Sequence, residues 1–401
     1  MHSGCPTTPP TPAGRSERPD LYFSNQIEIG PKIHRSADHP PGAMEFPPFE
    51  HLLYYERVHG ARLNISFSNI REFRLDGFGR SLPKDLDLNW TFRNGTPELR
   101  RLIARRHRAS PNRVLVTTGA TEGNFLVNAS LVHPRDRVLV DIPIYSPLRD
   151  VPRGVGAKVV EIPRECKDGW RLDLDRWRKL AGRRACLLVF ANLNNPTSTA
   201  LSRSDLRALA DIAEECDGHV LVDETFRELA FENRPPSAAE FGPRMIALST
   251  VTKVCGLGTL RVGWIVGAPD LLERFAGLKD YTTGGGSIVS QTIASWALGR
   301  WDFFLRRAKR ILDANRKIAT DALRDLPALQ GDVPVGGSVL FPHSTVHVGK
   351  LASRLLKQYG TVIAEGRFFG VPDHFRLGLG GEPRDLRMGL ANLRRLLRAV
   401  S

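Results

Sequence analysis

The chain has 401 residues, of which 41% are hydrophobic and 25% are charged. This composition is typical of a globular protein and argues against a collagen-like, coiled-coil or largely disordered chain. No apolar run approaches the roughly 18 residues that a membrane helix needs, and the first residues do not resemble a secretory signal. We therefore expect a cytoplasmic protein with no membrane partner, and the length favours two domains.

Lysine and arginine together number 57 against 43 acidic residues, so the formal net charge is +14. A nucleic-acid-binding protein usually gathers such charge on one arm or helix, with aromatic residues interleaved. Here the arginines are scattered, so we interpret them as solvated helix faces and expect no nucleic-acid partner. The five cysteines share no CxxC spacing, and we expect reduced thiols and no metal site.

Residues 1–45 are rich in Pro, Ser and Thr, which predicts a flexible arm. Beyond the arm, short apolar runs alternate with amphipathic stretches. The apolar runs predict strands at 113–117, 137–140, 158–162, 186–191, 219–223, 245–248 and 263–267. The stretches between them predict helices at 121–131, 145–154, 202–215 and 270–278. Strands that are apolar on both faces indicate an α/β fold with a mixed, mostly parallel sheet between helices.

After residue 285 the pattern changes. It predicts one long helix over 288–322 and then a small α+β segment, with strands at 338–341, 361–364 and 376–378 and a last helix over 382–399. We therefore expect a large α/β domain over residues 46–285 and a smaller α+β domain over 286–401. Residues near the start of the chain should contribute to the smaller domain.

Four polar motifs stand where a predicted strand ends, which is where ligands bind in open α/β sheets. The first, TGATEG at 118–123, opens a helix whose free N–H groups and hydroxyl suit a phosphate, although the same pattern starts ordinary helices. The second is NNPT at 194–197. Its Asn195 is held by the following proline and suits an oxygen of a bound ring, although Asn-Pro alone marks a turn.

The third motif is Asp223, the last residue of the strand HVLVD. A carboxylate in that position needs a cation, such as a protonated ring nitrogen, unless it caps the next helix. The fourth is STVTK at 249–253, in which Lys253 lies among small, apolar and hydroxyl residues with Arg261 eight positions on. A desolvated lysine near another cation has a lowered pKa, which imine formation with an aldehyde requires.

Together these motifs resemble the class I and II aminotransferases, which are pyridoxal phosphate (PLP) enzymes of fold type I. The resemblance runs from about residue 64 to residue 397 and depends on NNPT, the strand-ending aspartate and the run from Ser249 to Trp264. It implies a seven-stranded mixed sheet and a homodimer with shared active sites. It also implies that Lys253 binds the cofactor as an aldimine and later moves the α-proton.

The resemblance implies further roles at the same site. Asp223 would pair with the ring nitrogen, Asn195 would bind the ring oxygen beside the substrate, and Tyr145 would stack on the ring. Arg376 would bind the substrate α-carboxylate. The phosphate would be held by Ala120, Thr121, Thr250, Thr252 and Arg261.

The sequence departs from the family pattern at three positions. Phe226 stands where most aminotransferases have a tyrosine near the ring oxygen, and Ser198 replaces the glycine of NPTG. Trp90 stands where the family usually has a tyrosine that reaches the neighbouring subunit's site, so we expect Trp90 to contact the substrate or cofactor there. Phe226 and the runs PVGG at 334–337 and EGRFFG at 365–370 also resemble capreomycidine synthases.

We therefore predict a PLP-dependent enzyme that acts on an L-amino acid, most simply an aminotransferase. The alternative within the fold is an elimination, replacement or cyclisation enzyme of specialised metabolism that uses an arginine-like substrate or S-adenosylmethionine. A binding module without catalysis is a third hypothesis. The presence of Lys253, Asp223 and Arg376 together disfavours it.

Overall fold

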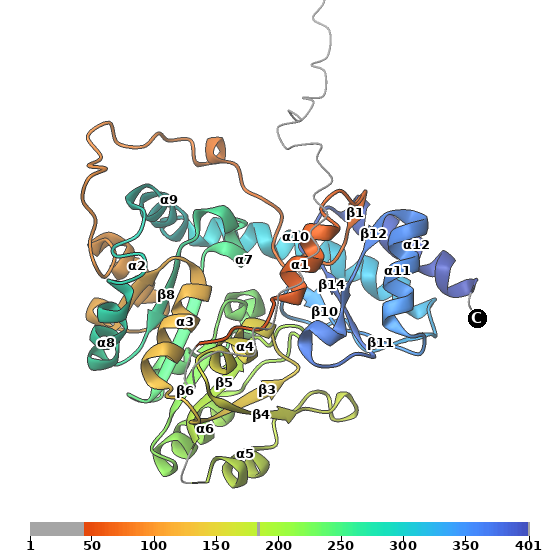
Figure 1. Cartoon of the computed structure of the whole chain (residues 1–401). Helices are drawn as coiled ribbons and strands as arrows, with labels where there is room; N and C mark the ends of the chain where they lie inside the picture. Colours follow the sequence, from red (N-terminus) through yellow and green to blue (C-terminus); the bar gives the residue numbers. More distant parts are fainter. Residues whose placement is uncertain (1–43, 183–184, 400–401) are drawn as a thin grey trace, which may run out of the picture. The chain divides into compact units, whose positions relative to one another are not determined.

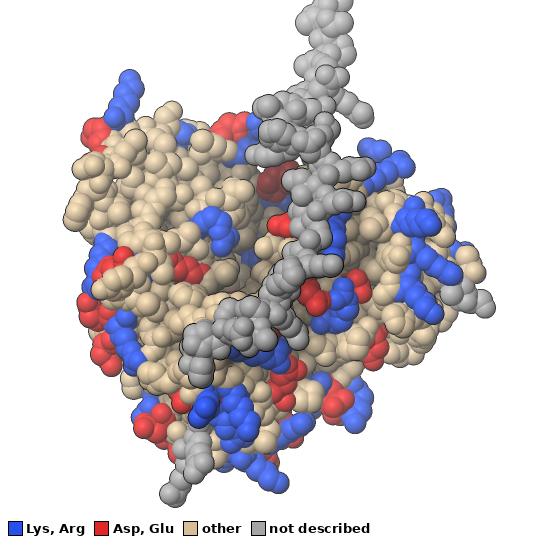
Figure 2. Space-filling model, in the orientation of Figure 1, with Lys and Arg blue, Asp and Glu red and all other residues tan. Residues whose placement is uncertain are grey.

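The computed structural model describes residues 44–182 and 185–399. Of the arm predicted over residues 1–45, residues 1–43 lie outside the described part. Within the described ranges, no helix combines the length and the apolar composition that a membrane span requires. On the face seen in Figure 2, basic side chains are spread over the surface with acidic ones among them.

In the described part of the chain, seven strands form one mixed sheet. Neighbouring strands follow the order β2 (Val114–Thr117), β8 (Gly263–Val266), β7 (Met245–Thr250), β6 (His219–Asp223), β5 (Ala185–Ala191), β3 (Arg137–Ile142) and β4 (Lys158–Pro163). The five strands from β7 to β4 are parallel, and β8 is antiparallel to both β7 and β2. The mixed, mostly parallel sheet that the sequence predicts is confirmed.

Helices cover both faces of this sheet (Figure 1). Alternate residues of a strand point to opposite sides, so a strand that is apolar throughout must be covered on both. In β6, Leu221 packs toward α3 (Gly119–Leu131), α4 (Ser146–Gly154) and α8 (Pro269–Lys279). Its neighbours Val220 and Val222 belong to the opposite cluster, which contains α2 (Pro97–Arg106), α5 (Leu174–Ala181) and α6 (Arg203–Glu215). The sheet is therefore buried between two helical layers, and its functional groups can emerge only at the strand ends.

The long helix predicted over 288–322 is two helices in the structure, α9 (Ile288–Gly299) and α10 (Trp301–Arg324). The break falls at Arg300, whose backbone φ is −111° and ψ is 30°. Glycine is a poor helix former, so Gly299 weakens the pattern there. Trp301 begins α10 and is buried to 4% exposure, and this burial offsets the free-energy cost of interrupting the helix.

The C-terminal part contains a three-stranded antiparallel sheet of β10 (Val339–Leu340), β14 (Phe375–Gly378) and β13 (Ala364–Glu365). It also contains α12 (Pro383–Arg398), the antiparallel pair of strands β9 (Leu329–Gln330) and β11 (His343–Ser344), and α11 (Val348–Tyr359). The sequence analysis did not predict α11. An early strand, β1 (Leu63–Asn64), pairs in parallel with β12 (Thr361–Val362). The domain limits at residues 285 and 286 stay a prediction.

The helix α1 (Glu50–Arg57) packs on this C-terminal part. Tyr54 and Val58 lie in one cluster with Val362 and Phe369, and the Tyr54 hydroxyl donates to the Ile363 carbonyl over 3.1 Å. Early residues are therefore joined to late ones, and α1 is held beside the strand ends of the large sheet.

Candidate active site

A cavity of about 200 Å³ lies where β6 and β7 end and α3 begins. Every predicted site residue except Trp90 lines it: Ala120, Thr121, Tyr145, Asn195, Asp223, Phe226, Thr250, Thr252, Lys253, Arg261 and Arg376. Trp90 lies outside the cavity, and its side chain is 69% exposed. The structure therefore brings together residues that are up to 256 positions apart, from Ala120 to Arg376.

One end of the cavity is suited to an anion. The first residue before α3, Thr118, makes no side-chain cap to the helix, so N–H groups of the first turn are available at the positive end of the helix dipole. The hydroxyls of Thr250 and Thr252 lie 3.0 Å apart on the same side. Arg261 adds a guanidinium to this end of the cavity. Such an arrangement binds phosphate.

Two glycines allow this close approach. Gly119 has a φ of +78°, and a Cβ there would lie 2.3 Å from the Arg261 Nη2 atom. A Cβ on Gly263 would lie 2.4 Å from the carbonyl carbon of Gly119. Strand β8 and the guanidinium can therefore reach the start of α3 only because both side chains are absent.

We predict that Gly263→Ala weakens phosphate binding at this end of the cavity at least about tenfold and lowers the free energy of unfolding by about 1–3 kcal/mol, because the new methyl group must displace the start of α3. Gly267→Ala is the matched control, since its Cβ would meet nothing nearer than 3.8 Å. Titration with a phosphate-bearing ligand and chemical denaturation measure the two effects. Equal behaviour of the two variants would show that the close contact does not shape the phosphate site.

Asp223 is the only carboxylate among the described residues that line the cavity. Its Oδ1 atom accepts a hydrogen bond from the Thr225 backbone N–H over 2.9 Å. Burial raises the pKa of Asp223, against the opposing effects of Thr225 and of the Lys253 charge. A cationic group placed against Asp223 would offset the cost of keeping it ionised.

Lys253 lies in the short helix α7 (Thr252–Cys255) and lines the cavity. Its Nζ atom donates to the Ser68 hydroxyl over 3.0 Å and to Asn69 Oδ1 over 2.6 Å. Burial, followed by the positive charge of Arg376, lowers the pKa of Lys253 to about 7. A large fraction of this amine is therefore uncharged and nucleophilic near neutral pH.

Arg376 in β14 enters the cavity from the C-terminal part and is buried to 2% exposure. Its Nη1 atom donates to Asn195 Oδ1 over 3.0 Å, and its Nη2 atom donates to the Ser66 carbonyl and the Tyr55 hydroxyl. The Nε atom is buried and has no hydrogen-bond partner in the described part of the chain. The bond from Arg376 also fixes the Asn195 amide, because its oxygen is engaged and its NH₂ group is left to donate elsewhere.

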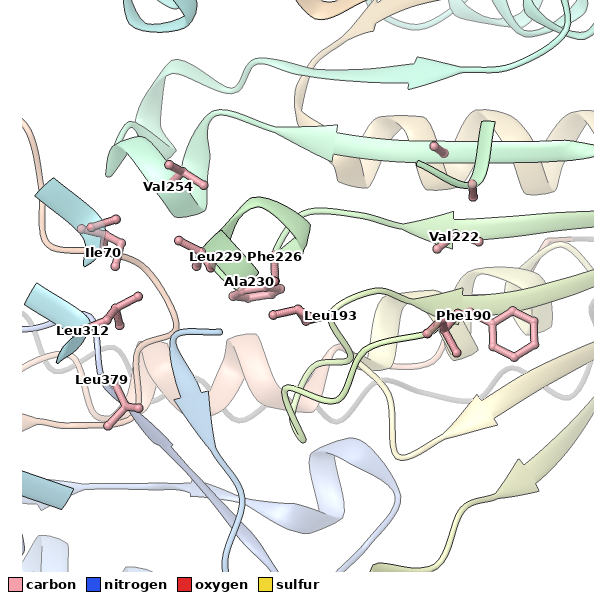
Figure 3. Close-up of a cluster of buried hydrophobic side chains, with 14 of the residues drawn as sticks. Ile70, Phe190, Leu193, Val222, Phe226, Leu229, Ala230, Val254, Leu312 and Leu379 are labelled. Carbon is pink, nitrogen blue, oxygen red and sulfur yellow. The ribbon is translucent and has the colours of Figure 1, made fainter. Parts of the chain in front are cut away.

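Phe226 follows β6 and is buried to 5% exposure. Figure 3 shows it among buried hydrophobic side chains, near Leu193 and Ala230. Its ring centroid lies 5.5 Å from the Lys253 Nζ atom. The cavity wall beside the lysine is therefore hydrocarbon at this position.

The sequence analysis missed six polar residues of the cavity: His51, Tyr55, Ser68, Asn69, Asn124 and Thr225. His51 and Tyr55 are four residues apart in α1, so they share one helix face. That spacing was the available signal. It could not show which part of the fold this face would meet.

The comparisons with known proteins agree with this geometry. The family model for aminotransferase class I and II matches residues 88–393. Capreomycidine synthase of Streptomyces vinaceus is 30% identical over 370 residues, which are 88% of this chain and 93% of that protein. Among solved structures, a PLP-dependent aminotransferase from Streptococcus suis is 26% identical with a TM-score of 0.84, over 89% of this chain and 99% of that one. The PLP-dependent cyclase OrfR is 27% identical with a TM-score of 0.81, over 91% and 100%.

The chain therefore belongs to the aminotransferase class I and II family. It is an enzyme of this PLP-dependent fold, and its cofactor is PLP.

The residues present fit that cofactor. Among the described residues, the cavity lining has three cationic side chains, Lys253, Arg261 and Arg376, but one carboxylate. This excess of positive charge suits a phosphate and an α-carboxylate together. The Thr225 hydroxyl is also buried and lacks a partner within the described ranges, which is consistent with a polar group bound beside Asp223.

Proposed function

We propose that this enzyme transfers the amino group of an L-amino acid, with Lys253 as the residue that holds the cofactor and moves the α-proton. The observation that carries the proposal is the position of Lys253. Its amine lies in one cavity with Asp223 and Arg376, and its pKa is lowered to about 7. An amine in that state can attack an aldehyde and can later accept or return a proton.

Bound PLP supplies an electron sink that makes the α-proton of an attached amino acid acidic. Asp223 would keep a positive charge on the ring nitrogen, and the free NH₂ group of Asn195 would donate to the ring oxygen. Tyr145 would cover the ring. The phosphate would be held by Ala120, Thr121, Thr250, Thr252 and Arg261.

Arg376 would bind the α-carboxylate as a two-pronged donor and so orient the α-carbon toward Lys253. Ser68 and Asn69 accept hydrogen bonds from the Lys253 amine. They would hold this amine in place whenever it is not bonded to the cofactor. Its lone pair would then be aimed by these contacts at the proton to be moved.

The test is product analysis with the purified holoenzyme, a panel of L-amino acids, and pyruvate or 2-oxoglutarate as acceptor. We expect a 2-oxo acid from one donor and the amino acid that corresponds to the acceptor. A product that keeps its amino group but has lost or closed its side chain would contradict transamination. It would instead support the cyclisation or elimination enzyme.

That second candidate is favoured by one observation in this chain, the phenyl ring at position 226 beside Lys253. The similarity to capreomycidine synthase and to the cyclase OrfR is consistent with it. Phenylalanine lacks the hydroxyl that a tyrosine would place at position 226, so the cavity excludes water better. Less water favours reaction at the substrate's side chain over hydrolysis of its bond to the cofactor.

We predict that Phe226→Tyr raises the yield of 2-oxo acid relative to any product that keeps its amino group, by several-fold. The reason is that the new hydroxyl supplies a donor near the ring oxygen and admits water. Phe67→Tyr, which adds a hydroxyl to a cavity residue that is 52% exposed, is the control. An unchanged product ratio would mean that Phe226 does not select the reaction.

We also propose that two copies of the chain form a homodimer with shared sites. Large apolar side chains are exposed at Leu88, Trp90 and Tyr281, to 74%, 69% and 90%. Arg93 pairs with Asp280, which places the segment before α2 near Tyr281. Exposed apolar groups of this kind mark interaction surfaces, and Trp90 would reach the partner's cavity.

A further inference from the structure

The wall of the cavity that α1 contributes contains a buried histidine. His51 is 3% exposed and lines the cavity together with Phe49, Leu52 and Tyr55. Neither the cofactor site nor the proton transfer uses it. In the part of the chain that the structure describes, no carboxylate on this wall pairs with it.

Aromatic side chains fix the orientation of the imidazole. Its ring stacks on Phe368 at 4.9 Å between centroids and 9° between planes, and it lies 4.7 Å from the Tyr55 ring. Phe369 meets it edge-on at 5.2 Å. The Nε2 atom is buried and has no hydrogen-bond partner within residues 44–182 and 185–399. Buried polar atoms are nearly always paired, so this one is missing a partner.

The charge state of His51 narrows what that partner can be. Burial, with the positive charges of Arg376 and Lys253, lowers the pKa of His51 to about 2. The imidazole is therefore neutral at physiological pH. A neutral imidazole offers a lone pair on one nitrogen and an N–H donor on the other, and it does not form an ion pair with an acid.

The position of His51 relative to Arg376 indicates which ligand reaches it. Tyr55, one helical turn beyond His51, contacts the His51 ring and accepts a hydrogen bond from Arg376 Nη2 over 3.1 Å. His51 is thus separated from the carboxylate-binding guanidinium by one side chain. An amino acid whose α-carboxylate is bound by Arg376 has the α1 wall beside its own side chain.

We propose that His51 is a specificity-determining residue, whose imidazole accepts a hydrogen bond from an N–H or O–H group on the side chain of the bound amino acid. The preferred substrates then carry a hydroxyl, amide or guanidine group in place of a plain hydrocarbon side chain. The inference rests on the proposed function, because Arg376 must hold the α-carboxylate.

The test measures binding of amino acids to the holoenzyme by titration of the cofactor absorbance, in pairs that differ in the donor group. The pairs are tyrosine and phenylalanine, glutamine and methionine, and arginine and norleucine. In the native enzyme we expect the donor-bearing member of at least one pair to bind about tenfold tighter or more. In His51→Phe this preference should fall to within about twofold, and His51→Gln, which keeps an acceptor, should retain part of it.

Leu52→Ala is the matched control, since Leu52 is the neighbouring cavity residue on α1 and is 49% exposed. It should change both members of each pair by the same factor. A preference that is absent in the native enzyme, or that survives in both His51 variants, overturns the assignment. Equal weakening of both members in both His51 variants overturns it too, because it shows a structural role only. If no amino acid alters the native spectrum or yields a product, the proposed function itself fails.

Discussion

Replacing Lys253 by alanine should abolish the covalent bond between protein and cofactor and lower kcat by about 10⁴-fold or more. The variant loses both the nucleophile and the group that moves the proton, and such groups each contribute large factors. The fold should stay intact, because the Lys253 amine contacts polar cavity residues, Ser68 and Asn69, and contributes no core packing. Circular dichroism and steady-state kinetics measure the two properties.

The control is Lys357→Ala, an exposed lysine on α11, which should behave like the native enzyme. Borohydride treatment of native holoenzyme followed by peptide mass analysis should find the cofactor attached to Lys253. Attachment to another lysine would show that the assignment is wrong.

The lowered pKa of Lys253 adds a pH dependence to this result. An amine reacts in its uncharged form, and a pKa of about 7 means that this form accumulates as pH rises toward 7. The rate at which cofactor-free protein takes up PLP should therefore rise about tenfold per pH unit below about pH 7 and level off above it. A rate that keeps rising beyond about pH 9 would indicate an ordinary, solvated lysine.

Replacing Arg376 by lysine should lower kcat/KM by a factor between about 30 and about 4 × 10³, although the charge is kept. A buried charged partner contributes roughly 2–5 kcal/mol when its hydrogen bonds are lost, and an ammonium cannot reproduce the planar fork. The guanidinium is also anchored by Asn195, Ser66 and Tyr55. Lysine would lose that orientation.

Arg367→Lys is the matched control, because Arg367 is 43% exposed and pairs with Glu365 at the surface. The native enzyme should also reject an amine that lacks the α-carboxylate. Equal turnover of an amino acid and its decarboxylated amine would contradict the role given to Arg376.

The sheet was predictable because its strands are buried on both faces, which leaves continuous apolar runs in the sequence. The run HVLVD has the bounds of β6, and the other sheet strands differ by one or two residues at their ends. The helix break at Arg300 and the helix α11 were not predicted. Periodicity alone does not show where packing interrupts or creates a helix.

The central motifs of the site were predictable for a similar reason. Asp223 ends a strand and Asn195 and Lys253 each follow one, so their meeting at one sheet edge follows from the topology. His51 and Ser68 reach the cavity through contacts with residues far along the chain, such as the pairing of β1 with β12 and the packing of α1 on the C-terminal part. Such contacts leave no local pattern. The role of Trp90 stays a prediction, since it concerns a second copy of the chain.

The attachment of α1 to the C-terminal strands has a consequence for how amino acids are ranked. Tyr54 donates a hydrogen bond to the Ile363 carbonyl and Tyr55 accepts one from Arg376. The guanidinium that would bind the carboxylate and the wall formed by α1 are therefore connected to each other. The residues that would bind the cofactor lie at the strand ends of the large sheet instead. If α1 and the C-terminal strands together moved closer to the large sheet or farther from it, turnover of all amino acids would change by a common factor. The order of preference among amino acids would be conserved, because the α-carboxylate and the side chain of the substrate contact the same part of the structure.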